Sequence, residues 1–237
     1  MLVAALVLLV LSLGLPWWSE TLTASGPSAA TSSQSYSPIS GVAGTCSPAC
    51  SSLAGNPPLS PFQGTKSFGS VGLNETGALY AGILGVVIIG IASVVIALVA
   101  SFVGPIRSRL RASAVLAAIV ASVLACGLLA SLQPLTYRTD HLAWLSDHGA
   151  WTVAPSPETS FWGSCAPGPS SGICASGWSV SWGPGPGWYL IAAAALVLMA
   201  IVLVPVLRAR RSRSSAGSTE KKDDAVDTTD VSAGNAR

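Results

Sequence analysis

The sequence predicts an all-α membrane protein: a bundle of four transmembrane helices with two outward loops. Half of the 237 residues are hydrophobic and only 9% are charged, whereas a typical soluble domain carries about 25% charged residues. Four apolar stretches occur, and three of them reach the roughly 20 residues that cross a bilayer. Basic residues gather where the predicted topology places the cytoplasm, as the positive-inside rule requires.

The composition also excludes several classes of protein. Twelve Lys and Arg against ten Asp and Glu leave a net charge of +2, too little for the basic footprint of a nucleic-acid-binding protein. The hydrophobic content is too high for an intrinsically disordered chain. Five cysteines in 237 residues are too few for a small disulfide scaffold.

The predicted spans contain no Asp, Glu, Lys, Arg or His, which argues against a pump, a proton-coupled carrier or a voltage sensor.

Residues 1–15 leave two interpretations open. We favour a retained anchor because no basic residue precedes the apolar run; the alternative is a cleaved signal peptide. The expected segments are transmembrane helices at 1–18, 78–104, 112–132 and 188–207, outward loops at 19–77 and 133–187, a cytoplasmic link at 105–111, and a basic, then disordered, cytoplasmic tail at 208–237.

Two arginine clusters orient the predicted spans. The link and the start of the tail carry these clusters, while the two long loops contain only Lys66 and Arg138. Because basic segments stay in the cytoplasm, both termini are predicted to be cytoplasmic, in the cell membrane. The clusters are also candidates for binding anionic lipid. Their members are Arg107, Arg109, Arg111, Arg208, Arg210, Arg211 and Arg213.

Four cysteines lie in the outward loops, where an oxidising compartment preserves disulfides. We predict local bridges that join Cys46 to Cys50 and Cys165 to Cys174. Four cysteines allow three pairings, so a bridge between the two loops stays open as the alternative.

The second loop is rich in tryptophan and is predicted to form a small lobe that serves as the interaction surface. Residues 178–182 alternate apolar and polar side chains, which indicates a short strand. Residues 140–148 are typical of a short interfacial helix with Thr139 as its N-cap. The candidate interface residues are Trp144, Trp151, Trp162, Trp178 and Trp182.

Two further expectations concern the first half of the chain. Residues 21–47 are dominated by Ser, Thr, Ala and Gly, and are therefore expected to be irregular. Trp17 and Trp18 follow the first apolar stretch and are expected in an aromatic belt at the outer membrane interface.

A metal or catalytic site is the least favoured interpretation. The pairs Asp140-His141 and Asp147-His148 repeat after seven residues, but two helical turns separate them by about 10.5 Å, too far for one ion. No phosphate-binding loop, zinc-protease motif or nucleophile elbow occurs. We therefore expect no cofactor, no metal and no enzymatic activity.

The expected function is that of an interaction or accessory subunit of a membrane assembly, acting through its outward loops. The expected partners are the lipid bilayer and either another membrane protein or a second copy of the chain, without nucleic acid. The alternatives are a transport or channel component, or an outward-facing metal-dependent membrane protein that uses Asp140, His141, Asp147 and His148.

Overall fold

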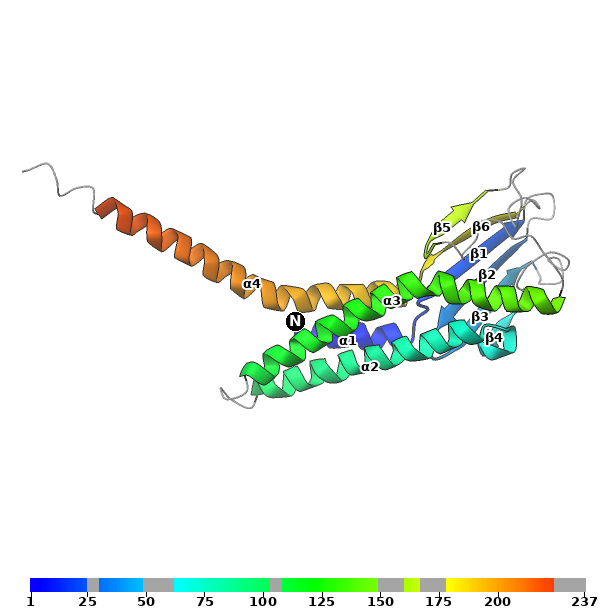
Figure 1. Ribbon diagram of the computed structural model, residues 1–237, viewed down its shortest axis with the longest axis horizontal. Coiled ribbons are helices and arrows are strands. Elements are labelled where there is room, and N and C mark those ends of the chain that lie inside the picture. Colours follow the sequence, from blue (N-terminus) through cyan, green and yellow to red (C-terminus); the bar gives the residue numbers. More distant parts are fainter. Residues whose placement is uncertain (25–29, 49–61, 103–107, 149–159, 167–177, 224–237) are drawn as a thin grey trace, which may run out of the picture. The chain divides into compact units, whose positions relative to one another are not determined.

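The computed structural model combines α-helices with an antiparallel sheet, so the predicted all-α fold is wrong (Figure 1). The structure describes residues 1–24, 30–48, 62–102, 108–148, 160–166 and 178–223, with backbone alone at 108, 141, 144–148, 178 and 208–223. The chain divides into two units, residues 1–198 and 199–237.

Along the described chain, a helix is followed by four strands and a 3-10 helix, then by two helices, two strands and a last helix. These elements are α1 (Leu2–Leu13), β1 (Trp18–Ala24), β2 (Thr31–Ser37), β3 (Gly41–Ser47), β4 (Gly64–Lys66), the 3-10 helix η2 (Gly69–Val71), α2 (Asn74–Phe102), α3 (Ser108–His148), β5 (Gly163–Cys165), β6 (Trp178–Pro184) and α4 (Pro186–Asp223).

Within the described residues, three helices are long and apolar enough to cross a membrane, at Asn74–Phe102, Arg109–Asp140 and Pro186–Leu207. The chain is therefore compatible with a multi-pass membrane protein. The predicted bundle of four spans is wrong, because only three of the four described helices meet this criterion and α1, with 12 residues, does not. Gly14 caps α1, and a strand begins four residues later.

The segment 21–47, expected to be irregular, forms most of three strands. The six strands lie in the order β4-β3-β2-β1-β6-β5, and every neighbouring pair is antiparallel. β1 pairs with β6 although they lie far apart in sequence, with Leu22 opposite Val180. The strand expected at 178–182 lies within β6.

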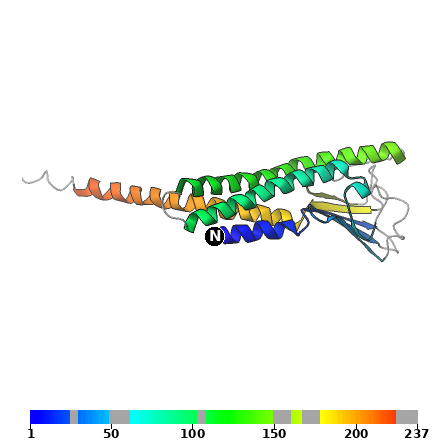
Figure 2. The same cartoon turned by 90° about the horizontal axis from the view of Figure 1, so that it is seen from below.

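One face of the sheet packs against α2 and α3 (Figure 2). This face is formed by alternate residues along the strands, and the side chains there are buried. The other face is half-buried or exposed, and this difference between the two faces explains the two-residue period. The main apolar residues of the buried face are Trp18, Leu22, Tyr36, Val42, Val180 and Trp182.

Trp17 and Trp18 do not form an interfacial belt, because both are completely buried within the protein (0% exposed). The Trp17 ring stacks on Tyr80 of α2 with 5.7 Å between the ring centroids. Trp18 meets the ring of Tyr36 edge-on at 4.9 Å and lies 5.7 Å from Tyr137 of α3. The two tryptophans therefore join the sheet to the helices.

The connection from α1 to β1 lies directly against the connection from β6 to α4. The Gly185 N–H donates to the Trp17 carbonyl oxygen at 2.9 Å, and the Gly187 N–H donates to that of Pro16 at 2.8 Å. A Cβ atom on Gly185 would overlap the Pro16 carbonyl oxygen. Glycine is required here because two backbones approach each other closely.

Replacing Gly185 with alanine is expected to lower the free energy of unfolding by about 1–2 kcal/mol, because the added methyl group forces the two connections apart. Thermal unfolding in detergent measures the effect. The matched control is Gly82→Ala, where a Cβ atom meets nothing within 4 Å. An equal loss of stability in both variants would contradict the assignment.

Candidate functional site

A buried carboxylate lies at the junction of the sheet and α3. Glu20 of β1 is 3% exposed. The Tyr36 hydroxyl donates to Glu20 Oε1 at 3.1 Å, and the Tyr137 hydroxyl donates to Glu20 Oε2 at 3.3 Å. A buried charge is tolerated only when it is hydrogen-bonded. Since Tyr137 belongs to α3, these hydrogen bonds attach the sheet to that helix.

The environment of Tyr36 predicts a pH-dependent stability. Burial, and then the neighbouring Glu20 and Tyr137, raise the pKa of Tyr36 well above its usual value near 10. The folded state therefore keeps a proton that the unfolded chain releases in alkali. The contribution of Tyr36 to stability is complete below about pH 10 and falls as the pH rises toward the raised pKa.

The Tyr36→Phe variant is expected to be about 1–2 kcal/mol less stable at neutral pH, because it loses the hydrogen bond to Glu20. Its deficit should shrink in alkali, since phenylalanine cannot ionise. Unfolding midpoints of both proteins at about pH 8 and about pH 11 give the comparison. A deficit that stays constant or grows would contradict the role of Tyr36.

Asp140 connects α3 to the beginning of α2. Its carboxylate is 4% exposed, and it accepts the N–H of Glu75 on Oδ1 and the N–H of Thr76 on Oδ2, both at 2.8 Å. The first N–H groups of a helix lack partners within the helix and favour a negative charge. Asp140 therefore caps α2 from a neighbouring helix.

The prediction of a separate interfacial helix at 140–148 is wrong. Those residues are the end of α3, which is continuous from Ser108 to His148. Thr139 does not cap a helix, because its hydroxyl donates to the Leu135 carbonyl oxygen one turn earlier at 3.0 Å. The helix continues beyond the span predicted at 112–132, and there Tyr137 and Asp140 attach it to the sheet and to α2.

Of the four residues of the metal hypothesis, only Asp140 has a described side chain. Among the described residues, no group of three His, Cys, Asp or Glu residues could hold a metal ion. Asp140 is engaged in capping. His141, Asp147 and His148 belong to α3, but their side chains lie outside the described part.

The positions of Cys46 and Cys165 exclude one of the disulfide pairings. Both are disulfide-bonded. Cys46, Ser32, Leu22, Val180 and Cys165 are successive partners across five strands. Four strand spacings of about 4.8 Å place the two cysteines about 19 Å apart, too far for a bond between them. Cys50 and Cys174 lie outside the described residues, so the local pairing stays a prediction.

The predicted interface tryptophans occupy different environments. Trp182 is 9% exposed, and its Nε1 donates to the Ser160 carbonyl oxygen at 3.0 Å, so it belongs to the core. Trp162, in contrast, is 62% exposed. Trp144 and Trp178 are in α3 and β6 with side chains outside the described part, and Trp151 lies outside the described residues.

The arginine clusters are partly described. Arg109 and Arg111 are exposed in the first turn of α3, and Arg107 lies outside the described residues. Arg208, Arg210, Arg211 and Arg213 belong to α4, with backbone alone described.

The second face of the sheet consists almost entirely of hydroxyl side chains, and we call it the hydroxyl face. In Figure 2, α2 and α3 follow the buried face, and no described helix covers the opposite one. The hydroxyl residues come from all six strands and pair across them in three rows. The rows are Ser47-Thr31-Thr23-Ser179, Thr45-Ser33-Thr21-Ser181-Ser164 and Thr65-Ala43-Ser35-Ser19-Gly183.

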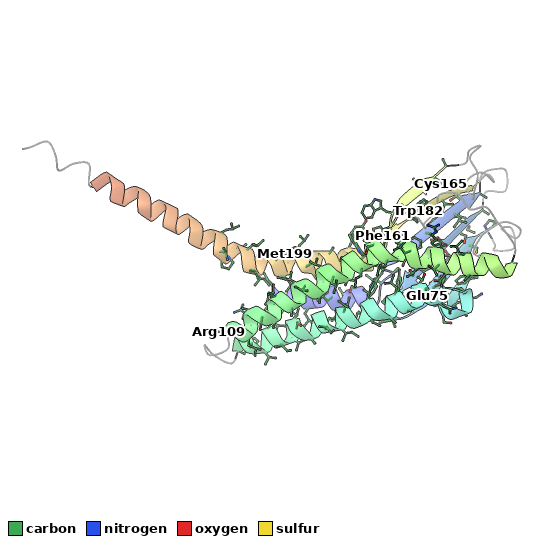
Figure 3. All side chains as sticks on the ribbon, viewed as in Figure 1. Glu75, Arg109, Phe161, Cys165, Trp182 and Met199 are labelled. Atoms are coloured by element: carbon green, nitrogen blue, oxygen red, sulfur yellow. The ribbon has the colours of Figure 1, made fainter. Side chains whose placement is uncertain are left out.

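Trp162 lies at the edge of the hydroxyl face. A Cβ atom on Gly183, at the end of the third row, would lie 3.4 Å from the Trp162 Cβ atom. Figure 3 labels the neighbouring Phe161 and the core residue Trp182 on the same part of the sheet. The Trp162 indole thus extends from the rim of a polar surface.

The hydroxyl face was missed by reasoning from the sequence, although a signal for it exists. Ser and Thr occupy every second position at 19–23, 31–35, 45–47 and 179–181. This two-residue period is the mark of one face of a strand. The period is hard to recognise because several of the alternating positions on the buried face are also polar, among them Glu20, Ser32 and Gln34.

The fold and the site together define the structural class of the protein. An antiparallel sheet is joined to three helices of membrane-spanning length, and one face of the sheet is buried while no described helix covers the other. No protein-family model matches the chain, and no curated protein or solved structure matches it significantly.

Proposed function

We propose that the chain is a non-enzymatic interaction subunit of the cell membrane that presents its sheet outside the cell and binds a partner through the hydroxyl face. The observation that carries this proposal is the asymmetry of the sheet. The buried face is occupied by α2 and α3, while the other bears hydroxyl rows uncovered by any described helix. Hydrogen-bonding groups in regular rows are suited to recognition rather than to packing.

The attachment of the sheet supports this function. Glu20 bonds to α3 through Tyr137, Asp140 joins α3 to α2, and Trp18 is packed between strand and helix. A surface held on rigid elements loses little conformational freedom when it binds a ligand. The hydroxyl face is therefore organised before any partner arrives.

The orientation follows from the arginine clusters. Arg109 lies at one end of the α2–α3 pair, and Glu75 and the sheet lie at the other (Figure 3). Because basic segments stay in the cytoplasm, the sheet faces outward and residues 208–237 are cytoplasmic.

Cysteine labelling tests this orientation. A membrane-impermeant maleimide should label Ser181→Cys on intact cells, because Ser181 is exposed on β6. It should label Ser218→Cys only after permeabilisation. Labelling of Ser218→Cys on intact cells would invert the topology and refute the proposal.

Photo-crosslinking in native membranes tests the partner. A photoreactive residue at Thr45 or Ser181, both exposed on the hydroxyl face, should yield a crosslinked product of higher mass. The control is Ile39, which is 65% exposed in the β2–β3 turn and lies outside the rows. No product at the two face positions, or the same product at Ile39, would refute the proposed function.

A further inference from the structure

We infer that the hydroxyl face binds an uncharged polysaccharide, with the Trp162 indole stacked on one of its sugar rings. The inference rests on the proposed function and specifies the chemical class of the partner. Three features of the surface lead to it: the array of hydroxyl groups, the absence of charge among the row positions, and a fixed exposed indole at the rim.

The array offers hydrogen bonds of the kind that sugars make. Each Ser or Thr hydroxyl has one donor and two acceptor sites, and sugar hydroxyls have the same capacity. Neighbouring positions in a row are about 4.8 Å apart, and successive positions along a strand are about 6.6 Å apart. The Thr21 and Ser33 hydroxyl groups are hydrogen-bonded to each other at 3.2 Å, and their oxygens keep acceptor sites for a ligand hydroxyl.

The lack of charged side chains in the three rows favours an uncharged ligand. The fourteen row positions are occupied by Ser, Thr, Ala and Gly, without Asp, Glu, Lys or Arg. A phosphate, a nucleic acid or an acidic glycan would find no counter-charge there. Protein interfaces are depleted in Ser and enriched in Arg and Met, unlike this surface. A neutral, hydroxyl-rich polymer matches it.

Trp162 supplies the apolar contact that a sugar ring also needs. The face of an indole is a large apolar surface, which suits the C–H face of a pyranose. The backbone around Trp162 is fixed on both sides. Trp18 Nε1 donates to the Phe161 carbonyl oxygen at 2.9 Å, and the Ser160 hydroxyl donates to the Trp162 carbonyl oxygen at 2.9 Å. The exposed ring is therefore held ready for stacking.

Binding to polysaccharides tests the inference with the full-length protein in mild detergent. The probes are amylose, cellulose, chitin and α-mannan, with dextran sulfate as the charged comparison. The wild-type protein should bind at least one neutral polymer more tightly than dextran sulfate. Trp162→Ala should weaken that binding at least tenfold, and so should the double variant Thr21→Val, Thr23→Val, which removes two hydroxyls but keeps side-chain shape and strand preference.

The control variant is Ile39→Ala, which changes another exposed apolar residue away from the rows and should leave binding unchanged. Unfolding midpoints confirm that each variant is folded. Failure to bind any neutral polymer, or binding that the Trp162 and threonine variants leave unchanged, overturns the inference. A protein crosslinked at Thr45 or Ser181 without polysaccharide binding refutes the inference while the proposed function stands; no crosslink and no binding refute both.

Discussion

Replacing Trp18 with alanine is expected to lower the free energy of unfolding by about 3–5 kcal/mol. Trp18 is completely buried, its ring contacts Tyr36 and Tyr137, and its Nε1 donates to the Phe161 carbonyl oxygen at 2.9 Å. The variant leaves a cavity and an unpaired carbonyl oxygen between sheet and helix. Thermal and denaturant unfolding in detergent, followed by circular dichroism, should show the sheet melting while helical signal persists.

The matched control for Trp18 is Trp162→Ala, the same substitution at a residue that is 62% exposed. An exposed side chain outside any core contributes little to stability, so the expected change is within about 0.5 kcal/mol. Trp18→Phe should be intermediate, since it keeps a ring but loses the N–H donor. Equal destabilisation by the two alanine variants would show that Trp18 does not join sheet and helix.

Replacing Asp140 with alanine is expected to lower the free energy of unfolding by about 2–3 kcal/mol. The variant leaves the N–H groups of Glu75 and Thr76 without the carboxylate that accepts them at 2.8 Å, and hydrogen bonds to charged groups are the stronger ones. Amide hydrogen exchange at the start of α2 should accelerate, because the cap holds that turn closed. Unfolding midpoints in detergent provide the second measurement.

Two further variants make the Asp140 result specific. Asp140→Asn keeps one acceptor oxygen and should lose roughly half as much stability as Asp140→Ala. Arg138→Ala changes an exposed residue two positions away on the same helix and should leave stability and exchange unchanged. Unaltered exchange at Glu75 and Thr76 in Asp140→Ala would rule out the capping role.

The membrane-length helices could be predicted because their signal is local. The apolar runs at 78–104, 112–132 and 188–207 overlap the helices of membrane-spanning length, since a span needs about 20 consecutive, predominantly apolar residues whatever they pack against. The extension of α3 to His148 could not be predicted. Beyond the predicted end at residue 132, the helix is attached through Asp140 and Tyr137 to partners 65 and 117 residues away in sequence.

The candidate site depended even more on distant pairing. Residues 19–24 and 31–47 carry so many small polar side chains that composition alone indicates irregular chain. They form strands because Leu22 meets Val180 and Trp18 meets Pro184 of β6, and because the helices bury the face that includes Glu20 and Gln34. A sheet edge or face has no stability until its partner is present.

By itself, the sequence determined which segments are apolar enough to enter a bilayer, where the arginines gather and which cysteines lie beyond the spans, because these properties belong to single residues and short windows. The tertiary structure alone decided that residues 21–47 form strands, that Trp17 and Trp18 are core, and that the alternate Ser and Thr residues share one face of the sheet. Those outcomes depend on strands far apart in sequence that align in register and bury one side against α2 and α3.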